Sequence, residues 1–213
     1  TRTEERYNKV HLNFGQKTLI ILVALKKSLT TEQICAHLRL KVNGQKNLKQ
    51  NKINKKFVYL ISPNKIPNIN FYDDLALVLS SKKITFFQLR LKKETNLNKL
   101  IIGKKIKKIC NKYKVKFLIN DDPLLAKKLN ADGCHLGQKD MDLIKARKIL
   151  KNKIIGVTCH NSINLAKKAI NDGADYLAFG AFYATKTKTV KYRASLTVLK
   201  SIKKITFLPI VAI

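Results

Sequence analysis

From Phe57 onward, short apolar runs alternate with amphipathic segments, and polar residues cluster after most of the runs. Runs of this length are typical of buried parallel strands, and apolar residues spaced three and four apart between them indicate helices. Strict alternation of strands and helices predicts a parallel sheet, either open or closed into a (β/α)8 barrel. The carboxyl ends of such strands carry the chemistry. The expected strands cover residues 57–61, 84–89, 115–119, 132–136, 153–157, 176–180 and 207–213.

The expected helices lie between these strands, most clearly at residues 97–113, 124–129, 163–170 and 196–202. The last apolar run, Val211 to Ile213, coincides with the end of the sequence. We therefore predict an α/β fold, a (β/α)8 TIM barrel truncated after strand seven. Seven strands leave the barrel open, so its first and last strands would be unpaired edges prone to association. We expect the chain to be a fragment of a longer reading frame.

Residues 1–55 have a different pattern. Thr30 or Thr31 could cap a short amphipathic helix, Asn43–Gly44 marks a turn, and residues 45–56 form a Lys- and Asn-rich run. We assign residues 1–55 to an extension of unknown role with its linker, and residues 56–213 to the barrel, incomplete at its C-terminus. A small DNA-binding helical unit in the extension is an alternative.

The strong basic charge is spread evenly along the chain. The formal net charge is +31, of which residues 1–55 carry +9 and residues 56–213 carry +22, and 38 of the 44 basic residues are lysines. A lysine- and asparagine-rich background explains this distribution better than a polyanion partner. We predict no nucleic-acid function, although the positive field would favour phosphate-bearing small molecules.

The cellular setting follows from short apolar runs and scattered cysteines. The longest apolar run, Thr18 to Leu25, is far below the roughly 20 residues that a membrane helix needs. The four cysteines form no CxxC pair, which favours reduced thiols over a disulfide framework. We predict a cytoplasmic protein with no membrane partner.

Two cations and an amide follow the second expected strand. Gln88, Arg90 and Lys92 alternate along the chain, so they share one face. A planar guanidinium beside an ammonium suits a phosphate or diphosphate. The alternative is a solvated basic strand end, which is common in so lysine-rich a chain.

Two aspartates come after the third and fourth expected strands. Asp121 and Asp140 would lie at the same end of a parallel sheet, close to a shared ion. Two carboxylates, with the other positions left to water and phosphate oxygens, are typical of a Mg²⁺ site. Each aspartate could instead cap a helix: Asp121 or Asp122 ahead of Pro123, and Asp140 ahead of Met141. The coincidence of both at one sheet end favours metal.

Other polar groups are less specific. The segment Thr185 to Lys188 could grip an oxyanion after the sixth strand. His135 and His160 each follow a cysteine, which suggests zinc, but neighbours on a strand point to opposite faces and cannot converge on one metal. Buried or hydrogen-bonded histidines are the better interpretation.

Six motifs occur in order at the carboxyl ends of the expected strands and the turns beside them: QLRLK, INDD, ADGCHLGQKD, GVTCH, GADYLAFG and TKTK. Together they resemble the thiamine-phosphate synthase family of TIM-barrel transferases, over the chain from about Phe57 onward. One departure is Ala184, where a proline commonly precedes the Thr-x-Thr-Lys segment of the family.

The resemblance implies a transferase of thiamine biosynthesis. It would couple a hydroxymethylpyrimidine diphosphate to a thiazole phosphate, with diphosphate departing ahead of attack by the thiazole nitrogen. No separate acid or base is then expected, because Mg²⁺ and cations stabilise the leaving group. A thiazole tautomerase-like enzyme, or another phosphate-binding barrel with a carboxylate base, is the alternative.

The resemblance also assigns roles to single residues. Arg90, Lys92 and Lys188 would stabilise the diphosphate, Asp121 and Asp140 would hold Mg²⁺, and Thr185, Lys186 and Thr187 would meet the thiazole phosphate. The residues expected to bind substrate are Gln88, Leu89, Arg90, Leu91, Lys92, Asn120, Thr158, Thr185, Lys186, Thr187 and Lys188.

Overall fold

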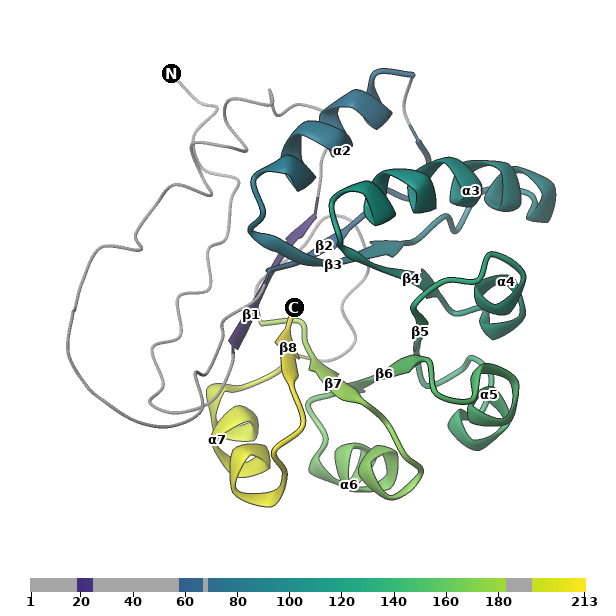
Figure 1. The fold of residues 1–213 in the computed structure, drawn as a ribbon. Helices are drawn as coiled ribbons and strands as arrows, with labels where there is room; N and C mark the ends of the chain where they lie inside the picture. Colours follow the sequence, from purple (N-terminus) through teal and green to yellow (C-terminus); the bar gives the residue numbers. More distant parts are fainter. Residues whose placement is uncertain (1–18, 25–57, 67–68, 183–192) are drawn as a thin grey trace, which may run out of the picture.

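Eight parallel strands form a closed barrel in the computed structural model, which describes residues 19–24, 58–66, 69–182 and 193–213. Helices surround the barrel and follow most of its strands (Figure 1). In chain order the elements are β1 (Leu19–Ala24), β2 (Val58–Ile61), α2 (Phe71–Ser80), β3 (Ile84–Leu89), α3 (Asn96–Lys112), β4 (Lys116–Asn120), α4 (Pro123–Lys128), β5 (Gly133–Leu136), α5 (Leu143–Leu150), β6 (Ile154–His160), α6 (Ile163–Asn171), β7 (Tyr176–Phe179), α7 (Leu196–Ile205) and β8 (Ile210–Ala212).

The predicted α/β barrel is confirmed, and β2 to β8 match the seven expected strands. One element differs. β1 lies within the segment assigned to the N-terminal extension, and it pairs in parallel with both β2 and β8. The prediction that the first and last expected strands remain as unpaired edges is therefore wrong, because β1 closes the sheet between them. The possible helix after Thr30 or Thr31 and the linker lie outside the described residues.

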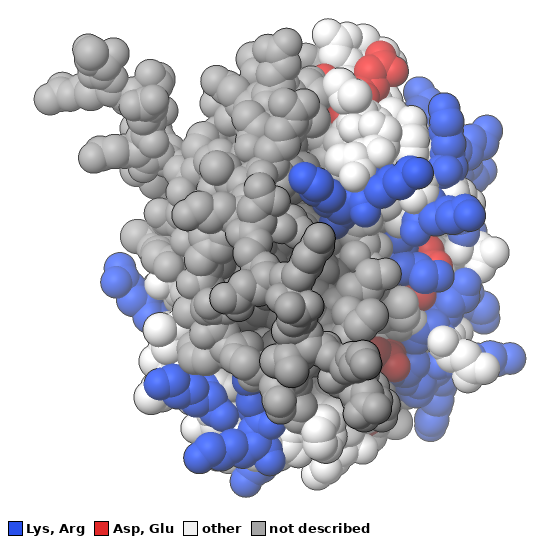
Figure 2. All heavy atoms as spheres, turned by 60° about the vertical axis from the view of Figure 1, so that its left-hand side comes forward, with Lys and Arg blue, Asp and Glu red and all other residues white. Residues whose placement is uncertain are grey.

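On the face shown in Figure 2, the lysine and arginine side chains of the described residues lie in more than one place and not in a single stripe. Acidic side chains are few and separate on the same face. This agrees with the even distribution of charge along the sequence. Among the described residues, no helix is both long enough and apolar enough to span a bilayer.

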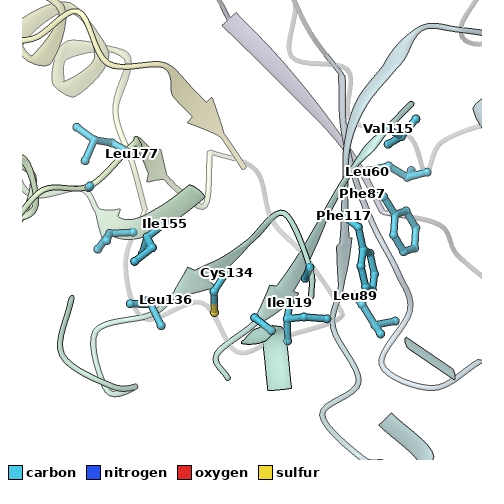
Figure 3. Close-up of a cluster of buried hydrophobic side chains, with 14 of the residues drawn as sticks. Leu60, Phe87, Leu89, Val115, Phe117, Ile119, Cys134, Leu136, Ile155 and Leu177 are labelled. Atoms are coloured by element: carbon cyan, nitrogen blue, oxygen red, sulfur yellow. The ribbon is translucent and has the colours of Figure 1, made fainter. Parts of the chain in front are cut away.

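Alternation along each strand divides the core into two layers. The outer layer lies between the barrel and the helices, and Figure 3 shows part of it with Phe87, Phe117, Cys134 and Leu177 from four strands. These side chains are fully buried. Helices cover this side of the strands and the barrel interior covers the other. Both faces are therefore buried, which requires near-continuous apolar runs.

The inner layer fills the barrel. Tyr59, Leu118, Tyr176, Ala178 and Val211 form this second cluster, on the alternate positions of β2, β4, β7 and β8. A glycine makes it possible: a Cβ on Gly156 would lie 1.8 Å from the Tyr176 ring. The absence of a side chain on β6 therefore creates the space that Tyr176 occupies.

Two aspartates fix the amino-terminal end of the barrel. Asp132 accepts a hydrogen bond from the Phe117 amide at 3.0 Å, and Asp175 accepts one from the Ile155 amide at 2.7 Å. Each aspartate precedes a strand and follows an alanine, in equivalent positions of two βα units. Each thus satisfies a backbone donor at the start of the preceding strand, which aligns neighbouring strands.

Candidate active site

Amide and hydroxyl side chains from three strands approach one another at the carboxyl end of the barrel. Gln88 at the end of β3 donates through Nε2 to Asn120 Oδ1 at the end of β4. Thr158 on β6 lies 2.8 Å from His135 Nε2 on β5. The structure therefore brings together the predicted substrate residues Gln88 and Asn120, and it links Thr158 to the same end of the barrel through His135.

Arg90 is positioned by the loop after β2. Its guanidinium donates to Asn64 Oδ1, and its backbone amide donates to Ser62 Oγ at 2.8 Å. Ser62 is itself buried and donates its amide to the Gln88 carbonyl at 3.0 Å. Ser62 and Asn64 were missed by the sequence analysis, although their place directly after an expected strand could have indicated them.

Leu89 and Leu91 lie on the opposite side of the chain from Gln88, Arg90 and Lys92. Both side chains are buried in the outer core layer, 3% and 5% exposed. The predicted alternation of this segment is confirmed. Any contact of Leu89 or Leu91 with a ligand at the strand ends would therefore be made by the main chain.

Asp121 follows β4 and is not a helix cap. Asp122 takes that role instead, accepting from the Leu125 amide at 2.8 Å, with Pro123 as the first residue of α4. Asp121 forms an ion pair with Lys92 and adopts φ of 66°. A left-handed conformation at an aspartate is uncommon, and such backbone is found frequently at functional sites.

Asp140 is not a helix cap either. α5 begins at Leu143, and its N-cap is Asp142, which accepts from the Ile144 and Lys145 amides. Asp140 instead folds back on its own loop and accepts from the Gly137 amide at 2.7 Å. For Asp121 and Asp140 alike, the capping alternative is therefore ruled out and both carboxylates are available to a ligand.

The two carboxylates affect each other. Burial raises the pKa of Asp121, but the hydrogen bond and charge of Lys92 outweigh it, so the net pKa lies below the ordinary value. Burial and the hydrogen bond with Asp121 raise the pKa of Asp140, although the Gly137 amide favours the ionised form. Among the described residues, Lys92 is therefore the cation that acts on both carboxylates, and Asp140 benefits less from it than Asp121 does.

This donor set fits Mg²⁺. The described residues include no group of three or more carboxylate, histidine or cysteine side chains able to hold a metal. Mg²⁺ is commonly bound by one or two carboxylates together with waters and substrate phosphates, and it does not need a full cage of protein ligands. A pair of hard oxygen donors beside cations that suit phosphate is such an arrangement.

His135 is a buried, hydrogen-bonded side chain, as the sequence analysis favoured. Its two ring nitrogens contact Tyr176 and Thr158 at 2.8 Å each. Burial lowers the pKa of His135 to about 4, so the imidazole is neutral at pH 7. Cys134 and Cys159 are buried free thiols in the outer core layer, where burial raises the pKa of each.

The predicted residues Thr185, Lys186, Thr187 and Lys188 lie outside the described residues, as does Ala184. The Asn161 side chain accepts from the Ser195 amide at 3.1 Å, which joins the end of β6 to the start of α7. Neither Asn161 nor Ser195 was among the predicted substrate or metal residues.

Together, the fold and the polar rim define the chain as a (β/α)8-barrel enzyme with a carboxylate and cation cluster at the carboxyl ends of its strands. Residues 58–213 match the family model of thiamine monophosphate synthase. A thiamine-phosphate synthase from Pelagibacter ubique is 97% identical over 166 residues, which are 78% of this chain and 80% of that protein. The chain belongs to the thiamine monophosphate synthase family.

More distant relatives agree. A thiamine-phosphate synthase from Nitrosomonas eutropha is 38% identical over 157 residues, covering 73% of this chain and 74% of its own length. The solved structure of a thiamine phosphate pyrophosphorylase from Pyrococcus furiosus superposes with a TM-score of 0.63 at 29% identity, covering 74% of each chain. The resemblance inferred from the six motifs is confirmed, and with it the prediction of a thiamine-biosynthesis enzyme.

Proposed function

We propose that this chain couples 4-amino-5-hydroxymethyl-2-methylpyrimidine diphosphate to a thiazole phosphate, giving thiamine phosphate and diphosphate. Membership of the family supports the reaction. The observation that carries it is the pairing of Asp121 with Asp140 beside Lys92, with neither aspartate used as a helix cap. Carboxylates that repel each other in the free protein are suited to a ligand that brings positive charge.

Asp121 and Asp140 would hold Mg²⁺ through carboxylate oxygens. Mg²⁺ bound there would neutralise charge on the substrate diphosphate and on the departing diphosphate. Lys92 already contacts Asp121, so it is placed to reach a phosphate oxygen brought to the same position.

Arg90 and Lys92 would bind the diphosphate, together with Lys188. In the proposed step the bond between the pyrimidine methylene carbon and the diphosphate oxygen breaks first, and both electrons leave with the oxygen. The thiazole nitrogen lone pair then forms the new carbon–nitrogen bond. In this step the protein has to stabilise negative charge on the departing diphosphate, and cations fixed at the strand ends would do so.

The remaining polar residues would bind the two heterocycles. Gln88, Asn120 and Thr158 would bind the pyrimidine diphosphate, and Thr185, Lys186 and Thr187 would contact the thiazole phosphate. Ser62 and Asn64 would hold Arg90 in place for the diphosphate.

The test is to incubate the protein with both phosphorylated substrates, with and without Mg²⁺, and to measure thiamine phosphate and diphosphate. We expect equal amounts of both products, formed only with Mg²⁺. Isomerisation of a thiazole phosphate without coupling would instead favour a tautomerase-like enzyme. Absence of any product from the coupled pair in the presence of Mg²⁺ would contradict the proposal.

We also propose that the basic surface is not a nucleic-acid site. The even spread of basic residues along the sequence supports this, as does their separation on the face shown in Figure 2. A gel-shift titration should show no DNA complex below about 1 µM at physiological salt, since non-specific binding typically has a Kd of about 10⁻⁴–10⁻⁶ M. A submicromolar complex would overturn it.

A further inference from the structure

A chain of hydrogen bonds crosses the interior of the barrel beneath the site. Tyr59 Oη lies 2.9 Å from Gln88 Oε1 and 2.7 Å from Tyr176 Oη. Tyr176 Oη lies 2.8 Å from His135 Nδ1, and His135 Nε2 lies 2.8 Å from Thr158 Oγ1. Tyr59, Gln88, His135 and Tyr176 are all at most 6% exposed, so water does not replace these partners.

With the Gln88 amide oriented as in the structure, the number of protons sets the direction of this chain of hydrogen bonds. A carbonyl oxygen only accepts, so Tyr59 donates its single hydroxyl proton to Gln88 Oε1. Tyr176 must then donate to Tyr59, because each phenol has one proton. Tyr176 has none left for His135, so His135 carries a proton on Nδ1 and donates it to Tyr176.

The same hydrogen-bond direction extends to the two residues at the rim, Asn120 at one end and Thr158 at the other. Gln88 donates through Nε2 to Asn120 Oδ1, so Asn120 has its N–H groups free for a ligand. An imidazole with one proton, held on Nδ1, accepts at Nε2. The Thr158 hydroxyl therefore donates inward to His135 and offers lone pairs to a ligand.

A fully reversed chain would also satisfy every group. In that arrangement the Gln88 amide is flipped, both tyrosine protons turn round, and the His135 proton moves to Nε2. Asn120 would then present its carbonyl, and Thr158 would present its proton. The two arrangements therefore offer opposite hydrogen-bonding patterns to the same ligand, and a mixture of them would discriminate poorly.

We propose that Tyr59 and Tyr176 are positioning residues that couple the orientation of Gln88 to the tautomer of His135, so that Asn120 presents donors and Thr158 presents an acceptor to the heterocycle. The inference rests on the proposed function for the identity of the ligand. A ring that offers a lone pair to Asn120 and an N–H to Thr158 has a ring nitrogen beside an amino group. A 4-aminopyrimidine has this pattern, whereas the corresponding 4-oxo ring, with N3–H and a carbonyl, has the opposite one.

The direction can be read in the protein without any ligand. Long-range ¹H–¹⁵N correlation spectra distinguish the two tautomers of a neutral histidine, and His135→Gln identifies the signals among the four histidines of the chain. We expect His135 to carry its proton on Nδ1. A proton on Nε2, or a mixture of both tautomers, would overturn the inference and leave the proposed coupling reaction unaffected.

Steady-state kinetics test whether the direction of these hydrogen bonds affects binding of the pyrimidine diphosphate. Tyr59→Phe removes the donor that orients Gln88, and Tyr176→Phe removes the acceptor of the His135 proton. We expect each to raise KM for the pyrimidine diphosphate by about three- to tenfold, the typical effect of one hydrogen bond, with kcat within about twofold. Tyr176→Phe should also weaken the preference for a 4-amino over a 4-oxo pyrimidine by a similar factor.

The matched control is Tyr113→Phe, at the C-terminal end of α3 on the outside of the barrel, which should leave KM and the preference unchanged. Equal losses of kcat and of bound substrate in all three variants would indicate general damage to the fold. An unchanged KM and an unchanged preference in both inner variants would show that the tyrosines only fill space. Either result would overturn the positioning role.

Discussion

The two ends of the barrel use the same residue types for opposite purposes. At the amino-terminal end each aspartate has a cation and a backbone amide of its own. Asp132 pairs with Lys116 and accepts from the Phe117 amide, while Asp175 pairs with Arg147 and accepts from the Ile155 amide. Both of these aspartates have their charge and their hydrogen bonds satisfied within the protein, which is consistent with a structural role.

At the carboxyl-terminal end two aspartates share one lysine. Asp121 has Lys92, while Asp140 has a backbone amide and a neighbouring carboxylate. Burial alone therefore does not separate the proposed metal-binding carboxylates from the structural ones. Among the described residues, what distinguishes Asp121 and Asp140 is that two carboxylates have one lysine between them, an arrangement suited to a positively charged ligand.

The backbone shows the same contrast. At the turns from helix to strand, left-handed residues follow one helix after another and simply end each helix. They are Lys82, Lys114, Asn130, Lys151 and Gly173. At the other end, among the described residues, the left-handed positions are Asp121 and His160, where a strand enters a loop. The contrast lies in position, because Asp121 and His160 adopt this backbone where strands end at the polar rim and not where a helix ends.

The largest expected effect is the loss of turnover when the charge of Asp121 or of Asp140 is removed. Asp121→Asn and Asp140→Asn each delete one carboxylate charge and preserve size. We expect turnover with both substrates and Mg²⁺ to fall by about 10³-fold or more, comparable to the loss of a main electrostatic contributor. Steady-state kinetics over a Mg²⁺ titration provides the measurement.

The thermal stability of the Mg²⁺-free protein should not fall with turnover in the Asp140→Asn variant. Without Mg²⁺, Asp140→Asn relieves the repulsion from Asp121 while an amide oxygen can still accept from Gly137, so its thermal midpoint should equal or exceed that of the unchanged protein. An Asp140→Asn protein that unfolds many degrees earlier would show that this end is structural as well.

The next effect concerns two glycines, one at each end. A Cβ on Gly137 would lie 2.8 Å from Asp140 Oδ2, so Gly137→Ala displaces that carboxylate. We expect the apparent Mg²⁺ affinity to fall by about tenfold or more, the usual consequence of disturbing a group that orients a metal ligand. Isothermal titration with Mg²⁺ and a non-reactive diphosphate would measure it.

Gly173→Ala is the matched control. Gly173 has φ of +90° with no atom near its missing Cβ, so alanine there is strained but touches nothing. It should lower the free energy of unfolding by about 1 kcal/mol and leave Mg²⁺ affinity unchanged. Equal Mg²⁺ affinity in the two variants would remove Gly137 from the site.

A smaller effect is expected at the amino-terminal end. Asp175→Asn weakens the link to Arg147, which keeps its bonds to the carbonyls of Lys151, Lys153 and Gly173. Because the Asp175 side chain is 46% exposed, we expect a loss of only about 1 kcal/mol in the free energy of unfolding. Urea denaturation would measure this, and kcat of the folded variant should not change; a large loss of kcat would break the contrast between the two ends.

The strands from β2 to β8 could be predicted because both faces of each are buried, which produces apolar runs that stand out in the sequence. β1 was missed since its run lies in a segment with no βα rhythm around it. β6 extends to His160, beyond the expected end at residue 157. The prediction ended too early because the last part of the strand, where it reaches the rim, contains polar residues.

The site could be predicted only in part. Asp121 and Asp140 were indicated by their positions after strands, but their freedom from capping depends on which of two adjacent aspartates caps α4 and on where α5 begins. The Tyr59–Tyr176 contact joins residues 117 positions apart across the barrel, and it needs the space above Gly156. No local pattern carries that information.

The smallest expected effect is on pH dependence. The pKa of Asp140 is raised and that of Asp121 is lowered, so on acidification Asp140 takes up a proton first. In the free protein the raised pKa means that stability falls as the pH rises through it, whereas the lowered pKa of Asp121 contributes stability that is lost as the pH falls through it. The proposed Mg²⁺ site needs both carboxylates ionised, so protons would compete with Mg²⁺ at Asp140. We expect the Mg²⁺ concentration for half-maximal rate to rise severalfold as the pH falls from neutral toward the pKa of Asp140, with the rate recovered by saturating Mg²⁺. Measurements at constant ionic strength separate this competition from screening, and a Mg²⁺ requirement independent of pH over that range would mean that Asp140 does not bind the metal.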